Sequence, residues 1–141
     1  MSANVSMAAT AVQFSQDTYN YAGGQEPYKM RLLSNAFSAD DVSNQYLVAT
    51  ALKNKFSRTT TFSVQNTSAD AIEATFKFYD ADNNGNLAST KTFVIPAFSS
   101  KWMDMAVDAD TGLSAPVFNG SAIITAVKQG TNTASEVVAS A

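Results

Sequence analysis

The stretch DADNNGN at residues 80–86 carries the acidic and amide side chains that bind calcium. Asp80, Asp82, Asn84 and Gly85 occupy the first, third, fifth and sixth positions of an EF-hand loop. The twelfth position, which requires a bidentate Glu, is Lys91, and the flanking residues have the periodicity of strands. A hairpin turn accounts for the same residues, because Asn84 and Gly85 suit its two positive-φ positions. We therefore predict a turn, and keep Asp80, Asp82 and Asn84 as candidate ligands of a surface calcium site.

A second acidic stretch, DADTG at residues 108–112, resembles the first and is also predicted to be a turn. Carboxylates in turns are usually solvated, so nothing in their positions points to a raised pKa. Histidine and cysteine are absent. Their absence excludes His-based acid–base catalysis, Ser–His and Cys–His nucleophile pairs, and zinc sites built on these residues. We therefore predict no enzyme activity, no catalytic residue and no cofactor.

A basic stretch, KNKFSR at residues 53–58, places Lys53, Lys55 and Arg58 around Phe56. One hypothesis makes it a contact patch for the acidic turns of a neighbouring subunit, and the alternative is a solvated loop.

Several side chains could contact sugars. Trp102 and the tyrosines at 19, 21, 28 and 46 have rings that stack on sugars or line an interface, although a tryptophan in a sandwich more often packs at the edge of the core. Three N-x-S/T sequons begin at Asn4, Asn66 and Asn119, and they are candidate glycosylation sites if the source organism glycosylates. Surface glycans are therefore a candidate partner.

The composition is polar but weakly charged. Only 15% of the residues are charged, while Ser and Thr together number 30, a mixture common in extracellular β-proteins and filaments. The net charge of −3 gives no basic surface, so nucleic acid is not an expected partner. No stretch approaches the roughly 20 apolar residues of a membrane span. The start, MSANVSMAATAVQF, lacks the regions of a signal peptide, so in an exported protein it is expected to be the mature sequence.

The elements that must position these residues are mainly strands. Residues 71–80 alternate cleanly between apolar and polar side chains, which predicts a half-buried strand, and residues 120–130 are apolar on both faces, which predicts a central strand. Further strands are predicted at 46–53, 59–67, 87–96, 98–105 and 134–141. Short strands at this spacing indicate one antiparallel β-sandwich, at residues 46–141.

Residues 1–45 differ from the rest and are predicted to be an N-terminal extension. Residues 4–14 have strand character, with Val5, Met7, Ala9 and Ala11 on one side, and an irregular Gly-, Asn- and Tyr-rich link follows. Residues 29–37 suit either a short helix or a strand. The strand at 4–14 is a candidate donor for a neighbouring subunit, and the alternative is that it pairs within its own sandwich.

From residue 52 onward the chain resembles the immunoglobulin-like β-sandwich repeats of exported bacterial surface proteins. The resemblance is carried by TTFSVQN (60–66), the hairpin YDADNNG (79–85), the strand end IP (95–96) and the strand start GSA (120–122). It implies an all-β, antiparallel, immunoglobulin-like β-sandwich and a cell-surface or extracellular location. The single module with its own N-terminal strand extension departs from the multi-repeat pattern of that family.

These observations lead to one main functional hypothesis. The chain is expected to be a structural subunit of an extracellular, pilus-like filament or surface assembly, in which copies polymerise head-to-tail by strand donation. The donor strand would enter a groove on the neighbouring copy, walled by the strands around Phe62, Val64, Ile123 and Val127. Two alternatives remain: a virion structural protein, as a capsid decoration or tail component, and a monomeric adhesive or carbohydrate-binding surface module.

Overall fold

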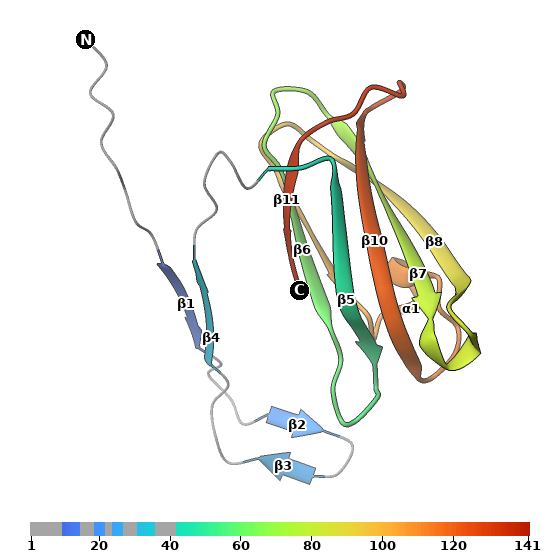
Figure 1. Cartoon of the computed structure of the whole chain (residues 1–141). Coiled ribbons are helices and arrows are strands. Elements are labelled where there is room, and N and C mark those ends of the chain that lie inside the picture. The colour runs from blue at the N-terminus through green and yellow to red at the C-terminus, as the bar shows by residue number, and fades with distance from the viewer. Residues whose placement is uncertain (1–9, 15–18, 22–23, 27–30, 36–41) are drawn as a thin grey trace. The chain divides into compact units, whose positions relative to one another are not determined.

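The computed structural model describes residues 10–14, 19–21, 24–26, 31–35 and 42–141. The chain forms two units, Met1–Asp40 and Asp41–Ala141 (Figure 1).

The described residues of the first unit form four short strands in two antiparallel pairs. β1 (Thr10–Phe14) pairs with β4 (Arg31–Asn35), and β2 (Tyr19–Tyr21) pairs with β3 (Gly24–Glu26). The segment 29–37, for which both helix and strand were open, therefore contains a strand. Of the predicted strand at 4–14, residues 10–14 are a strand, and residues 4–9 lie outside the described residues.

The second unit is a sandwich of two antiparallel sheets, which confirms the predicted all-β sandwich (Figure 1). The four-stranded sheet has the order β5-β10-β7-β8, and the three-stranded sheet has the order β11-β6-β9. The strands are β5 (Gln45–Lys53), β6 (Thr61–Asn66), β7 (Ile72–Asp80), β8 (Asn86–Ile95), β9 (Ser100–Asp104), β10 (Phe118–Lys128) and β11 (Val137–Ser140).

The apolar side chains of the two sheets meet between them. β7 alternates as predicted, with Ile72, Ala74, Phe76 and Phe78 buried and the intervening side chains on the outer face. Phe62 of β6 packs edge-to-face against the rings of Phe76 and Phe78 from the other sheet, at centroid distances of 6.1 and 6.2 Å. Such pairs add a geometric preference to the burial of apolar area, so they fix how the two sheets face each other.

β10 is the central strand that its sequence predicts, because it pairs with β5 on one side and β7 on the other. Gly120 lies where the pairing with β5 shifts register, and a Cβ at this position would lie 1.9 Å from the carbonyl oxygen of Tyr79. Only glycine permits this close approach of the backbone of β7.

The order of the strands could not be predicted from the sequence. In the constant-type immunoglobulin arrangement, the first strand shares a sheet with the second, and the seventh shares a sheet with the sixth. Here the first strand of the sandwich, β5, pairs with the sixth, β10, and the last strand, β11, pairs with the second, β6.

Within residues 42–141, two short helical turns lie between the strands. The 3₁₀ turn η2 (Ala81–Asn83) connects β7 to β8, and α1 (Asp108–Thr111) follows β9. The segment DADTG was predicted to be a turn, whereas its first four residues form one turn of helix that ends at Gly112, with φ of 70°.

Candidate functional site

The turn at 80–86 uses its acidic side chains within the protein. Asp80 accepts a hydrogen bond from the backbone N–H of Asp82 at 2.9 Å, and Asn84 and Gly85 have φ of 55° and 74°. The turn therefore joins β7 to β8 as predicted. Asp82 accepts from Lys55 Nζ at 2.9 Å and from Asn119 Nδ2 at 3.0 Å.

The contacts of Asp82 bear on the calcium hypothesis. The hydrogen bond from Lys55, together with that from Asn119, holds the pKa of Asp82 below its ordinary value of 3.8. A carboxylate that is already neutralised by a lysine is a poor calcium ligand, because the ammonium would have to leave first. In the described part of the chain, no three acidic, histidine or cysteine side chains gather as a metal-binding group.

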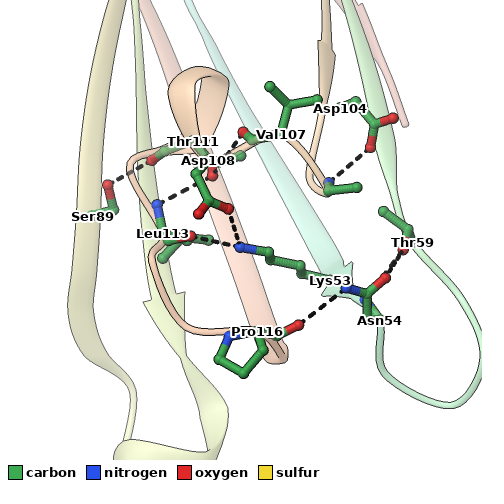
Figure 2. A network of polar contacts seen from close by, with 11 residues as sticks. Lys53, Asn54, Thr59, Ser89, Asp104, Val107, Asp108, Thr111, Leu113 and Pro116 are labelled. Atoms are coloured by element: carbon green, nitrogen blue, oxygen red, sulfur yellow. Dashed lines mark hydrogen bonds and ion pairs between the residues drawn. The ribbon is translucent and has the colours of Figure 1, made fainter.

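The second acidic stretch is held by a buried lysine. Lys53, only 3% exposed, donates from Nζ to Asp108 and to the carbonyl oxygen of Leu113, the latter at 2.6 Å (Figure 2). Ser89 of β8 donates to the carbonyl oxygen of Thr111 at 2.6 Å, which holds the other side of the same turn. These contacts tie α1 and the segment after it to the ends of β5 and β8.

Asp110 pairs with a second lysine, Lys101, at 3.3 Å. Three of the four ion pairs in the described residues thus join a lysine to one of the two acidic turns. Two of these lysines, Lys53 and Lys55, belong to the basic stretch that was proposed to contact the acidic turns of a neighbouring subunit. They contact acidic turns of their own chain.

The tip of the β5–β6 loop has an uncommon backbone. Lys55 and Arg58 exchange two backbone hydrogen bonds, of 3.1 and 2.9 Å, around the turn residues Phe56 and Ser57. Both turn residues have positive φ, 54° and 57°, and Phe56 is 72% exposed. Asn54, with φ of 49°, donates from Nδ2 to the carbonyl oxygen of Pro116 and contacts Thr59 (Figure 2). Sequence analysis missed this turn because such turns normally have Gly, Asn or Asp at the central positions.

The residues predicted to wall a donor groove do not meet in one place. Phe62 and Val64 are fully buried between the sheets, where the core rings of the protein itself occupy the space beside them. Ile123 and Val127 alternate with the buried residues of β10, so their side chains lie on the outer face of the four-stranded sheet, away from the core. Of the predicted donor residues, Ala11 lies in β1 opposite Ser34. Val5, Met7 and Ala9 lie outside the described residues.

The two described sequon asparagines differ in access. Asn66 is fully buried, and its Nδ2 donates to the carbonyl oxygens of Asp70, Ile95 and Pro96 at 2.7, 3.2 and 2.9 Å. A glycan would need that nitrogen, so the folded domain does not present Asn66 for modification. Asn119 faces outward on β10 and contacts Asp82, and Asn4 lies outside the described residues.

Trp102 lies on β9, opposite Ser63 of β6, and is 55% exposed. Nearly half of its surface is thus covered, and the rest of its ring is open to solvent. Of the four tyrosines considered with it, Tyr46 is partly buried and its hydroxyl donates to the carbonyl oxygen of Val137 at 3.2 Å. Tyr19 and Tyr21 belong to β2, and Tyr28 lies outside the described residues.

Comparisons with protein-family models, with curated proteins and with solved structures gave no match. The resemblance to surface-protein modules therefore stays a prediction. Within the described residues, no helix has the length and apolar character needed to cross a membrane.

Proposed function

We propose that this protein is a non-enzymatic structural subunit of an extracellular filament or surface assembly, in which the N-terminal strand segment of one copy joins the sandwich of the next. The observation that carries the proposal is the pairing within the first unit. β1 and β4 have five residues each and pair with one another in a two-stranded sheet. An isolated two-stranded sheet is at best marginally stable in water, so this segment gains stability from any further strand or apolar surface.

The sandwich has edges that can receive a strand. In the described residues, β5 and β8 are the edges of one sheet, and β9 and β11 are the edges of the other, although Val137 of β11 already exchanges two hydrogen bonds with Ser43. The outward N–H and C=O groups of an edge strand hydrogen-bond an added strand, which is how β-strand addition works. Because donor and acceptor lie on different parts of the polypeptide, each contact between copies is heterologous, and both ends of a growing filament remain able to bind another copy.

The packing of the core limits where the donor strand can go. Phe62 and Val64 already contact core residues of their own chain, so a donor does not fill a vacant core position beside them. The proposal therefore places the donor on the outside of a complete sandwich.

Negative-stain microscopy of the full chain beside a variant lacking residues 1–15 tests this function. The full chain is expected to form fibres or layers, and the truncated chain is expected to remain monomeric. Thermal unfolding of both proteins, followed by circular dichroism, should show the same cooperative transition of the sandwich, which controls for its misfolding. Two monodisperse monomers, or two equally assembled proteins, would contradict the proposal.

A second candidate function, sugar binding, is favoured by the exposure of Trp102. Its indole lies on a sheet face beside Ser63 and follows Lys101, so a sugar ring stacked on it would find polar neighbours. Retention of the protein on a polysaccharide column that is lost in Trp102→Ala would support this function. Equal elution of the two proteins would exclude it for that polysaccharide.

A further inference from the structure

The sandwich has two distinct ends, which the register of its strands defines. The chain enters at Ser43, which bridges Val137, and β5 then runs over nine residues, about 30 Å, to Lys53. We call the end around Lys53 the far end. It consists of the loop 54–60, the turn 81–85 with the start of β8, and the segment 105–117 (Figure 1).

Exposed apolar side chains concentrate at the far end. The described residues include eight large hydrophobic side chains that are exposed. Four of them lie at the far end: Phe56, Leu87, Val107 and Val117, which are between 45% and 72% exposed. Leu47, Val94 and Trp102 lie on strands of the sheets, and Phe98 follows β8 at the end where the chain enters. These four side chains come from separate segments of the far end, so that end offers a partner several apolar contacts, as interaction sites do.

Phe56 is the most exposed of the four, and its backbone is strained. A bulky side chain at positive φ is a steric outlier that Gly, Asn or Asp would relieve. The protein nevertheless has phenylalanine at a turn position with φ of 54° and leaves 72% of it in solvent. Strain of this kind occurs at binding sites; because Phe98 shares it, the choice of Phe56 rests on its position at the far end.

The turn that presents Phe56 is anchored on both sides. Lys55, directly before it, forms an ion pair with Asp82 at 2.9 Å, and its Nζ lies 5.6 Å from the centre of the Phe56 ring. Asn54 bonds to Pro116, next to the exposed Val117. A partner that binds here meets a preformed surface, so the binding costs less conformational entropy than binding to a loose loop.

We propose that the far end is the acceptor surface for the N-terminal unit of a second copy, with Phe56 as its apolar anchor. This inference rests on the proposed function and assigns the apolar part of its contact: the edge strand β5 ends here and the edge strand β8 begins here, so a donor strand paired with either edge reaches the far end. The occupant follows from where the chain enters the sandwich: the entry at Ser43, which bridges Val137, is at the end opposite the exposed apolar side chains. Head-to-tail growth requires two different contact surfaces, and surfaces at opposite ends favour an open filament over a closed ring. The donor segment also supplies the matching chemistry, in Val5, Met7, Ala9 and Ala11.

The chain contains a matched control for Phe56. Phe98 has nearly the same φ, 55° against 54°, and nearly the same exposure, 68% against 72%, but it lies at the other end of the sandwich. Asparagine tolerates positive φ, so Phe56→Asn and Phe98→Asn remove the ring in each case without adding backbone strain.

The test measures the critical concentration for assembly of the full chain by sedimentation, together with Tm. Phe56→Asn is expected to raise the critical concentration about tenfold or more, as for the loss of an aromatic anchor, with Tm equal to or above that of the unaltered chain. Phe98→Asn is expected to leave the critical concentration within about twofold. Val117→Ser, as an independent change at the far end, should also raise the critical concentration.

The outcomes separate this inference from the function on which it rests. If the unaltered chain assembles, the chain lacking residues 1–15 does not, and Phe56→Asn assembles normally, the acceptor lies elsewhere and only this inference is overturned. An equal effect of Phe98→Asn would overturn it too, because the loss would then not be specific to the far end. If the unaltered chain never assembles, the proposed function fails first.

Discussion

Replacing Asn66 by Ala should be among the most destabilising single changes in the sandwich. Asn66 is fully buried at the end of β6, and its side chain connects three segments of the chain. Its Nδ2 donates to three carbonyl oxygens, and its Oδ1 accepts from the N–H and the hydroxyl of Ser68 at 2.9 and 2.7 Å. Alanine removes every one of these bonds and leaves buried polar groups behind.

The size of the effect follows from the hydrogens involved. Nδ2 has two hydrogens for three acceptors, so the side chain makes about four full hydrogen bonds. At roughly 1 kcal/mol net for each hydrogen bond, their loss destabilises the folded state by about 4 kcal/mol. Folding orders the asparagine side chain at an entropic cost of about 1 kcal/mol, and alanine avoids this cost, which offsets part of the loss. The expected cost is therefore about 3 kcal/mol, or a Tm lower by more than about 10 °C in a domain of this size.

Urea unfolding followed by circular dichroism measures this cost, and Asn119→Ala is the matched control. Asn119 is also a sequon asparagine, but it faces outward and makes one exposed bond to Asp82. Its replacement should change the free energy of unfolding by less than about 1 kcal/mol. If Asn66→Ala unfolded within 1 kcal/mol of the unaltered chain, with the same slope against urea, the assignment of Asn66 as the link between these segments would be wrong.

Three further changes test other contacts of the sandwich. Asp108→Ala removes the ion pair of the buried Lys53 ammonium and leaves it only the carbonyl oxygen of Leu113. Because Asp108 is 61% exposed, urea unfolding should show a loss of stability of only about 1–2 kcal/mol. An unchanged free energy of unfolding would mean that the ion pair does not hold α1. Lys55 and Asn119 lower the pKa of Asp82 in the folded protein below its ordinary value of 3.8. The ionised carboxylate therefore stabilises the folded state at pH values above 3.8, and this stabilisation is lost as the pH falls through the lower pKa of the folded state. Asp82→Asn should therefore destabilise the protein near pH 7 and have a smaller effect near pH 3, and an unchanged difference in urea midpoint at the two values would contradict the ion pair. Gly120→Ala places a methyl group against a backbone carbonyl oxygen of β7 and should lower stability by about 2 kcal/mol or more, whereas a thermal melt unchanged from that of the unaltered chain would show that the two strands can separate at little cost.

The parts of the fold that depend on local pattern could be predicted from the sequence. The alternation in β7 and the Asn84-Gly85 turn each depend on neighbouring residues only, and both are found in the structure. The central position of β10 follows from its apolar residues on both faces. Hydrophobic periodicity and turn chemistry act over a few residues, so one sequence is sufficient to show them.

The candidate sites depend on contacts between residues that are distant in the chain. Lys53 pairs with Asp108, 55 residues away, and Lys55 pairs with Asp82, 27 residues away. No local pattern distinguishes a lysine with such a partner from a solvated one, so the sequence left open whether the basic stretch contacts a neighbouring subunit or lies in a solvated loop. The facing of Phe62 and Ile123 was missed for a related reason: both are apolar strand residues, and only the register of the sheets places one inside and the other outside.

Cross-linking between two labelled copies tests the head-to-tail contact most directly, because the chain has no native cysteine. Met7→Cys in one full-length copy and Val117→Cys in another would be mixed during assembly and treated with a short bis-maleimide linker. The account predicts a cross-linked dimer in this mixture, and much less of it when Phe98→Cys replaces Val117→Cys. Equal cross-linking at the two positions, or none with Val117→Cys in assembled material, would contradict the account.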